Sequence, residues 1–326
     1  MSPLLIAGTK QGVVVAGRPN GAWQVQRRSL ETHQVNSLSV EGDTVVAGTR
    51  QGIYWSGDLG LTWQPANEGL TEPLVRWLAH HPDGSGTVLV GTEPATLYLS
   101  RDGGQTWAER PEVAQLRDKH GWYLPYSPEA GCVRGFSFVA GGDRVYAAVE
   151  VGGLLRSDDR GETWGLVEGS SGDPRALPEG HIHPDVHSVV VHPSSPDLVF
   201  APTGGGFFSS EDGGQMWEQR YRCYCRAVWV DPHDAGHLVL GPADSVNRDG
   251  RIERTRDGRG SWDPASEGLE VPWSRNMVER FLQDGEELFA VLANGELLSA
   301  PLGTLAWQRI LPDVEGVRCL GFMNLG

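Results

Sequence analysis

One short segment carries the residue types with the most versatile chemistry. Residues 181–187 place potential metal ligands or acid–base groups at alternate positions, namely His181, His183, Asp185 and His187. In an extended strand alternate side chains point to the same face, and imidazole, carboxylate and thiolate groups bind zinc and other transition metals. The three histidines and Cys223 of the next repeat unit therefore form a candidate site for a divalent transition metal. Pro184 interrupts the alternation, so a hydrogen-bonded polar turn beside buried thiols is the alternative.

The same segment also offers acids and bases. Asp185 and His187, with Glu129 in a long loop upstream, are the candidate catalytic residues of a hydrolase or lyase. Glycosidases that use two carboxyl groups hold them roughly 5 to 10 Å apart across the scissile bond. Spacing along the chain does not fix that separation, so a catalytic site and a noncatalytic binding site both stay open.

A second set of candidates is defined by its position in seven short apolar strands. The second residues of these strands are Asn36, Arg76, Arg134, His187, Arg226, Glu279 and Arg318. If the strands surround one opening, these arginines and the histidine create a positive potential there, which attracts an anion. In the alternative, the arginines pair with Glu279 or with loop carboxylates such as Glu129 and Asp185. The set predicts an anionic small molecule or protein segment as the ligand.

Aromatic residues gather in the segments between the repeated units. The longest of these segments are 108–132 and 165–185, and long loops in a compact protein often carry function. The candidate ligand-stacking residues are Trp122, Tyr123, Tyr224 and Trp273. Such rings suit a sugar, an aromatic group or a peptide, and they serve equally well to pack loops against the body of a protein.

Strands must position all of these residues. The seven inner strands begin with an apolar residue and cover 35–40, 75–80, 133–138, 186–191, 225–230, 278–283 and 317–322. Further apolar runs follow most of them and end in Gly-Thr-like turns, as in Thr44–Thr49 and Thr87–Thr92. We find no stretch with the 3.6-residue apolar period of an amphipathic helix, so the pattern predicts an all-β protein.

A second repeat lies between the strands. The segments Ser56–Trp63, Ser100–Trp107, Ser157–Trp164, Ser210–Trp217 and Thr255–Trp262 follow the pattern S-x-D-x-G-x-T-W, with Arg259 in the glycine position of the fifth copy. Asp and Ser or Thr side chains satisfy the backbone of a tight turn, glycine takes a positive φ angle, and Trp covers the turn. The aspartates are therefore predicted to be scaffold rather than catalytic groups.

This motif resembles the Asp-box, or bacterial neuraminidase (BNR) repeat. With degenerate copies included, its tryptophans are Trp23, Trp63, Trp107, Trp164, Trp217, Trp262 and Trp307, and each interval can hold a four-stranded propeller blade. The resemblance is to the sialidase-like Asp-box β-propeller superfamily, and in plan to WD40/YVTN/BNR-like repeat proteins and photosystem II assembly-factor-like propellers. It implies that the boxes lie on the face away from the ligand. The Arg-Ile-Pro motif and Tyr/Glu pair of sialidases have no counterpart that we can map, and a fold does not by itself give function.

The repeats predict a single seven-bladed β-propeller over residues 1–326. The first unit lacks an inner strand, whereas the C-terminal end has one in excess. Residues 316–326 are therefore expected to pair with residues 3–27 and complete blade 1, which leaves no unpaired sheet edge at the seam. Blades 2–7 are expected within residues 33–311.

Composition narrows the classes of function. The chain of 326 residues has 27 Lys and Arg against 42 Asp and Glu, a net charge of −15, which argues against nucleic-acid binding. No apolar run approaches the roughly 18 residues of a membrane span, and the first residues lack the pattern of a signal peptide, so neither a membrane partner nor export is expected. The four cysteines do not suggest a disulfide framework, and a cytoplasmic protein is expected.

The favoured hypothesis is a binding propeller with an arginine-rich channel mouth and aromatic loops between its blades. The alternative is a hydrolase or lyase, glycoside hydrolase-like or metal-dependent, with its active site on the same face. No cofactor follows with certainty from the residues, and a divalent transition metal is the one that their types allow.

Overall fold

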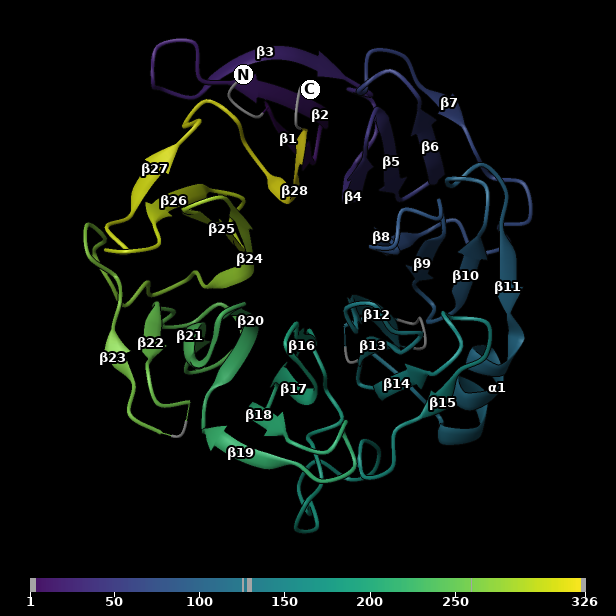
Figure 1. Ribbon diagram of the computed structural model, residues 1–326, viewed down its shortest axis with the longest axis vertical. Coiled ribbons are helices and arrows are strands. Elements are labelled where there is room, and N and C mark those ends of the chain that lie inside the picture. The colour runs from purple at the N-terminus through teal and green to yellow at the C-terminus, as the bar shows by residue number, and fades with distance from the viewer. Residues whose placement is uncertain (1–3, 125, 128–130, 259, 324–326) are drawn as a thin grey trace.

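The strands form a closed ring. The computed structural model describes residues 4–124, 126–127, 131–258 and 260–323. Seven four-stranded antiparallel sheets stand around one axis, as the blades of a seven-bladed β-propeller (Figure 1). The predicted all-β class and the predicted number of blades are confirmed.

The blades follow one another along the chain, and each runs from an inner strand at the axis to an outer strand at the rim. Blade 1 contains β28 (Val317–Met323), β1 (Leu4–Thr9), β2 (Gly12–Gly17) and β3 (Gln24–Ser29). Blade 2 contains β4 (Val35–Glu41), β5 (Thr44–Thr49), β6 (Gly52–Ser56) and β7 (Gln64–Pro65). Blade 3 contains β8 (Val75–His80), β9 (Val88–Thr92), β10 (Leu97–Ser100) and β11 (Ala108–Arg110).

The remaining blades repeat this order. Blade 4 contains β12 (Cys132–Phe138), β13 (Val145–Glu150), β14 (Gly153–Ser157) and β15 (Gly165–Leu166). Blade 5 contains β16 (Val190–His192), β17 (Ser195–Thr203), β18 (Gly206–Ser210) and β19 (Glu218–Tyr221). Blade 6 contains β20 (Tyr224–Asp231), β21 (Asp234–Ala243), β22 (Glu253–Thr255) and β23 (Asp263–Pro264). Blade 7 contains β24 (Val278–Asp284), β25 (Glu287–Leu292), β26 (Leu297–Pro301) and β27 (Gln308–Ile310).

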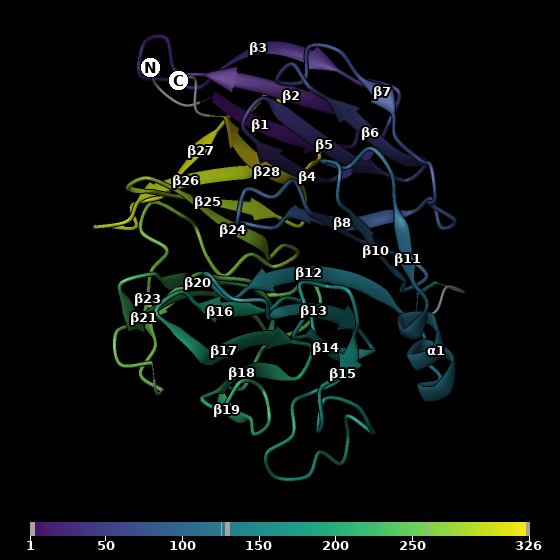
Figure 2. The same cartoon turned by 45° about the vertical axis from the view of Figure 1, so that its right-hand side comes forward.

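The two ends of the chain meet in blade 1. β28 pairs antiparallel with β1, with Leu4 opposite Met323 and Ala7 opposite Leu320. β1 and β28 lie side by side in Figure 1, and Figure 2 shows the ring from a second direction. The predicted closure by the C-terminal strand is therefore confirmed, and the outer strand β3 continues to Ser29, past the predicted limit at residue 27.

The middle strands are apolar because each blade is covered on both faces. All residues of β2, with the sequence Gly-Val-Val-Val-Ala-Gly, are buried, as is typical of strands packed on both sides. Glycines let the next blade approach closely. A Cβ added to Gly48 would lie 2.3 Å from Val75 Cγ1, and one added to Gly91 would lie 2.3 Å from Val133 Cβ. The first valine of an inner strand, Val75 or Val133, thus packs against a glycine of the blade before it.

The Asp boxes form the predicted turns. The Asp58 carboxylate accepts hydrogen bonds from the Thr62 backbone N–H at 2.8 Å and from Thr62 Oγ1 at 2.6 Å, while Ser56 Oγ accepts from the Gly60 N–H at 2.8 Å. The hydrogen bonds from Thr62 are the largest cause that lowers the pKa of Asp58 to about 2. These carboxylates are committed to their own turns, as the sequence predicted.

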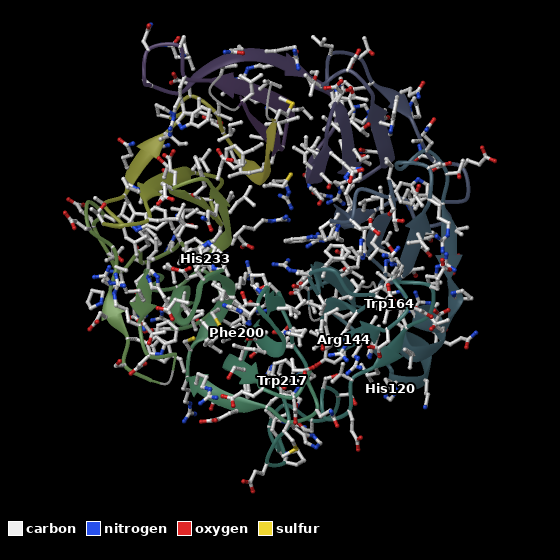
Figure 3. All side chains as sticks on the ribbon, in the orientation of Figure 1. His120, Arg144, Trp164, Phe200, Trp217 and His233 are labelled. Atoms are coloured by element: carbon white, nitrogen blue, oxygen red, sulfur yellow. The ribbon has the colours of Figure 1, made fainter. Side chains whose placement is uncertain are left out.

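The box tryptophans fill the spaces between blades. Trp164 packs in the cluster shared by blades 3 and 4, and Trp217 packs in the cluster shared by blades 4 and 5 (Figure 3). Each box connects the third strand of a blade to the fourth. The boxes therefore lie on the opposite face from the loops that join one blade to the next.

Segment 108–132 differs from the predicted loop because it contains α1 (Pro111–His120), the one α-helix among the described residues. Pro111 occupies the first turn and Gly121 ends the helix in the left-handed conformation, which are local start and stop signals. Only Val113 of the helix is buried, so the apolar period that would have predicted it is missing. α1 lies at the rim beside β15 (Figures 1 and 2). In the part of the chain that the structure describes, no helix is long and apolar enough to cross a membrane.

The inner strand of blade 5 is shorter than predicted. β16 begins at Val190 rather than at Val186, and residues 181–189 are irregular apart from a single bridge between Val186 and Thr203. Pro184 cannot donate a hydrogen bond to a ladder, which agrees with the break. The histidines therefore do not alternate along a regular strand, and the interruption at Pro184 is the feature that the structure shows.

Candidate functional site

Most inner strands carry one extra residue near their start. In five of them the register of paired residues skips the residue after the first valine, which is the second position of the predicted strand. These residues are Asn36, Arg76, Arg134, Glu279 and Arg318. In β20, Arg226 and Ala227 together stand opposite Gly241 alone. These β-bulges bend the strand and redirect the side chain of the extra residue.

The second-position side chains reach one cavity at the axis of the ring. This central cavity has a volume of about 370 Å³, and its walls include Asn36, Arg76, Arg134, His187, Arg226, Glu279 and Arg318. The structure therefore brings together all seven positions that the repeat singled out. Six of them stand near the start of their inner strands and His187 precedes β16, so the cavity opens on the face of the inter-blade loops, opposite the Asp boxes.

Third-position residues reach the central cavity as well. Trp77, Ser188 and Arg280 line it, although strict alternation along a strand would turn them to the other face. The Arg280 guanidinium lies 3.8 Å from the centre of the Trp77 ring and donates a hydrogen bond to the Asn36 carbonyl oxygen at 3.1 Å. Sequence reasoning omitted Arg280 and Trp77 because a bulge is not visible in the residues of one strand.

Glu279 holds two of the arginines. Its carboxylate pairs with Arg226 and lies 3.3 Å from Arg134 Nη2. Burial raises the pKa of Glu279, but the two guanidinium groups outweigh burial and leave that pKa lowered. The pairing expected as the alternative to an anion site therefore holds for these two arginines.

Two arginines also pair with glutamates of their own blades. Arg76 Nη1 lies 3.2 Å from Glu93 Oε2, and Arg134 Nη1 lies 3.4 Å from Glu150 Oε2. Both glutamates are buried. They occupy equivalent positions in their blades. Val75 pairs with Thr92, which precedes Glu93, and Val133 pairs with Val149, which precedes Glu150. The sequence analysis did not include these two glutamates. An acidic residue at the end of the second strand of a blade was the pattern that could have indicated them.

Two arginines of the cavity lack such partners. The equivalent position in blade 1 is Lys10, so Arg318 has no glutamate there. Within the described residues, the ion pairs of the cavity involve neither Arg318 nor Arg280. Burial lowers the pKa of Arg280 to about 10, and burial together with repulsion from Arg76 lowers the pKa of Arg318. The cavity thus carries more positive than negative charge.

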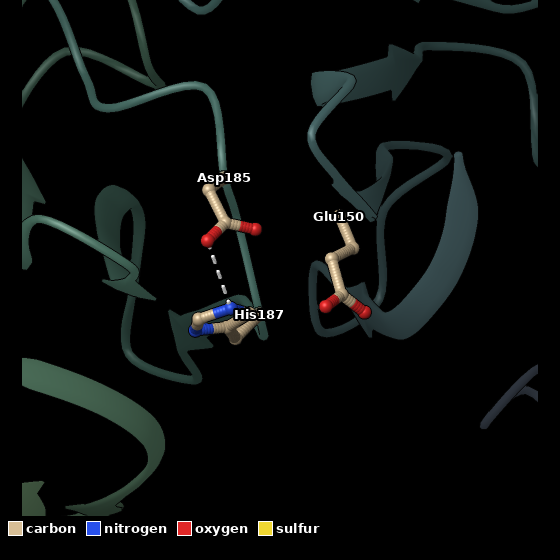
Figure 4. A group of neighbouring side chains, drawn as sticks. All are labelled: Glu150, Asp185 and His187. Carbon is tan, nitrogen blue, oxygen red and sulfur yellow. Dashed lines mark ion pairs between the residues drawn. The ribbon is translucent and has the colours of Figure 1, made fainter. Parts of the chain in front are cut away.

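Three titratable groups cluster at the edge of the cavity, and two of them, Glu150 and His187, line it. Figure 4 shows the three side chains. Asp185 Oδ2 lies 3.2 Å from His187 Nε2, and one potential ligand atom from each of Glu150, Asp185 and His187 lies within 4.8 Å of the others. Burial raises the pKa of Asp185, but His187, His183 and Arg134 together outweigh burial and leave that pKa lowered. Two predicted catalytic residues, Asp185 and His187, thus meet, whereas Glu129 lies outside the described residues.

The other predicted metal ligands do not join this cluster. Among the residues that the structure describes, His181, His183 and Cys223 belong to no group of three potential ligands. His183 Nδ1 instead accepts a hydrogen bond from the Asp185 backbone N–H at 3.2 Å. The irregular backbone around Pro184 is the physical reason, because it does not hold alternate side chains on one face.

The predicted stacking residues have different surroundings. Trp122 is 7% exposed and packs in the core of blades 3 and 4, and Trp273 packs against the core of blades 6 and 7. The Tyr224 hydroxyl lies 3.3 Å from His187 Nε2. Tyr123 is 60% exposed. The packing alternative therefore describes the two tryptophans, and Tyr224 contacts the cluster.

A second cavity lies beside this cluster. It has a volume of about 450 Å³ and is lined by residues that include Trp122, Tyr123, His183 and Asp185. Glu150 and His187 line the central cavity instead. The cluster therefore stands between the two cavities, with Asp185 on the side of the second.

Comparison with known proteins supports the repeat and the fold. Residues 98–109 match the family model of the BNR/Asp-box repeat, and no curated protein matches the sequence. The structure of YCF48 from Cyanidioschyzon merolae is similar with a TM-score of 0.62 at 13% identity, over 94% of this chain and 90% of that one. A structure of YCF48 bound to D1 peptide has a TM-score of 0.61 at 14% identity, over 90% of this chain and 88% of that one.

An ancestral GH74 enzyme is similar to a comparable degree. Its TM-score is 0.63 at 17% identity over 89% of this chain. The chain spans only 38% of the length of that enzyme. At these identities the structural similarities establish a shared propeller fold. The family-model match identifies residues 98–109 as an Asp-box repeat.

Proposed function

We propose that this protein is a binding propeller whose central cavity holds the anionic group of a small molecule or of a protein segment. The observation that supports this is the charge of the cavity, where Arg280 and Arg318 add to three arginines that already share the carboxylates. Burying a charge without a partner costs free energy. An anion beside Arg280 and Arg318 would recover part of that cost, and guanidinium groups match carboxylate and phosphate in shape.

The size of the cavity and one structural neighbour favour a protein segment. About 370 Å³ suits a few side chains or a small carboxylate rather than an extended polymer. The propeller YCF48, which shares the fold at 14% identity, has been solved bound to a D1 peptide. We therefore expect an acidic peptide or a small polycarboxylate as the ligand of this chain.

The test is a thermal-shift series with citrate, inorganic phosphate, a hexa-aspartate peptide and a hexa-lysine peptide as probes. At about 100 times its dissociation constant, a bound anion stabilises the fold by about 2.7 kcal/mol. We expect citrate or hexa-aspartate to raise the melting temperature and hexa-lysine to have no effect. Arg318→Gln should abolish the rise, whereas the matched control Arg28→Gln, on the exposed outer strand β3, should keep it. Equal shifts in both variants, or none with any anion, would overturn the proposal.

A second candidate function is a hydrolase or lyase that uses the cluster at the edge of the cavity. The observation that favours it is the meeting of an acid and a base, Asp185 and His187, with Glu150 beside them. The structural neighbours include the ancestral GH74 enzyme and, with a TM-score of 0.53 at 14% identity, the GH74 xyloglucanase from Xanthomonas campestris. Release of reducing sugar from xyloglucan by the wild-type protein, lost in Asp185→Asn and kept in the box variant Asp102→Asn, would support this candidate. No release by wild-type protein would remove it for that substrate.

A further inference from the structure

We propose that Glu150, Asp185 and His187 form a site for one divalent transition-metal ion. One carboxylate oxygen from each acid and one imidazole nitrogen lie within 4.8 Å of one another, and Glu150 and His187 are buried. The three residues come from two neighbouring blades, since Glu150 ends β13 and the other two precede β16. The inference does not rest on the proposed anion-binding function, because Arg280 and Arg318 take no part in it.

The hydrogen bond of His187 prepares its other nitrogen for a metal. Nδ1 lies 2.8 Å from the Cys225 carbonyl oxygen. A carbonyl oxygen can only accept, so Nδ1 carries a proton, and Nε2 is the ring nitrogen that can bind a metal ion. Metal-binding histidines commonly donate their second N–H to a backbone carbonyl, which fixes the ring and its tautomer.

The spacing of the first two ligand atoms suits a metal between them. His187 Nε2 and Asp185 Oδ2 are 3.2 Å apart. Two ligands that each lie about 2.0 to 2.2 Å from a tetrahedral zinc ion are separated by roughly 3.3 to 3.6 Å. Figure 4 shows the Glu150 carboxylate facing the same space. A small side-chain adjustment of Glu150 would complete three ligands.

The charges around the cluster also favour a cation. The two carboxylates face one close guanidinium, that of Arg134, which lies 3.4 Å from Glu150 and is shared with Glu279. Asp185 Oδ1 is buried and has no hydrogen-bond partner among the described residues. A buried carboxylate oxygen in that state is costly, and a metal ion would relieve the cost.

The donor set limits the choice of metal. One imidazole nitrogen and two carboxylate oxygens suit Zn²⁺ or Mn²⁺, whereas soft ions such as Cu⁺ prefer thiolate. Three protein ligands leave a position for water or a ligand, as in zinc sites that are not closed. Because Glu150 and His187 line the central cavity, that position is accessible from the cavity.

The test measures metal binding directly. Full-length protein is treated with EDTA, desalted and titrated with ZnCl₂ by calorimetry, with zinc content checked by elemental analysis. We expect one zinc per chain and a rise in melting temperature that EDTA reverses. Asp185→Asn and Glu150→Gln should each weaken binding by more than about tenfold. The control His192→Gln, whose ring Nε2 faces the Asp231 carbonyl oxygen at 3.2 Å, should bind zinc as the wild type does.

Each outcome decides the proposal. Less than half a zinc per chain after titration, or the same affinity in Asp185→Asn, Glu150→Gln and wild type, would overturn it. If one of these variants does not fold, the other variant and the response of wild-type melting to zinc and EDTA still decide. Zinc binding with no response to anions would support this site while removing the anion proposal, so the two can fail separately.

Discussion

The two faces of the ring are built from the same repeat, yet they satisfy their polar groups in different ways. On the Asp-box face, the carboxylates of Asp58 and Asp102 accept hydrogen bonds within their own turns, in almost the same geometry. On the cavity face, equivalent positions hold different residues, and Arg318 has no carboxylate partner among the described residues. The residue types of the Asp boxes thus recur and serve the scaffold, whereas the residue types at the cavity positions vary from blade to blade.

Removing residues 316–326 should cause the largest loss of stability, because both faces depend on a closed ring. Without β28, β1 loses its inner neighbour and blade 1 exposes an unpaired edge. We expect the cooperative thermal transition to disappear in calorimetry. A chain that ends at Met323 keeps β28 and is the control. A truncated chain that melts at the wild-type temperature would contradict closure as the source of stability.

A smaller but still large loss of stability is expected where a glycine lets two blades approach closely. In Gly91→Ala the new Cβ would meet Val133 Cβ at 2.3 Å, whereas in the control Gly135→Ala the nearest atom lies at 3.8 Å. Overpacking of this kind costs about 1 to 3 kcal/mol. Urea unfolding should show that loss for Gly91→Ala, and a change within about 0.5 kcal/mol for Gly135→Ala. Similar losses in both would mean that close approach is not what Gly91 provides.

A single Asp box should contribute less, and its contribution should depend on pH. Burial raises the pKa of Asp102, but hydrogen bonds from Ser100 and Thr106 outweigh it and lower that pKa to about 2. The folded value lies below the unfolded value of about 3.9, so the stabilisation is present above about pH 4 and is lost as the pH falls through 2. Asp102→Asn should cost about 1 kcal/mol or less at pH 7, since the group is exposed.

The pH dependence supplies the control for this box. The difference between Asp102→Asn and wild type should shrink towards zero near pH 2, measured by chemical unfolding at several pH values. Asp118→Asn, which removes an exposed carboxylate beside Arg117, should change stability little at any pH. A cost for Asp102→Asn that stays constant down to pH 2 would show that the carboxylate charge is not what holds the turn.

The same contrast explains what the sequence could predict. The blade count, the closing strand and the seven second positions follow from patterns that recur in every unit. Arg280, Glu93 and Glu150 depend on bulges and on how one strand aligns with the next, which no single segment reveals. Of the predicted metal ligands, His187 meets Glu150 and Asp185, whereas the irregular backbone around Pro184 does not hold His181 and His183 beside it. Local irregularity therefore marks the limit of prediction from the repeat.

The smallest predicted change in stability is an increase, and it concerns Arg318 in the central cavity. Arg318 is partly buried, and burial and Arg76 lower its pKa, so its charge opposes folding. Replacing it with the neutral Arg318→Gln should raise the free energy of unfolding by a few tenths to about 1 kcal/mol, as removal of an unpaired charge from a binding site often does. Arg28→Gln, on the exposed outer strand, should leave stability unchanged in the same urea titration. The substitutions in the scaffold described in the preceding paragraphs all lower the free energy of unfolding. A substitution in the cavity that raises it would therefore distinguish the two faces. A loss of stability in Arg318→Gln would instead place this arginine with the scaffold.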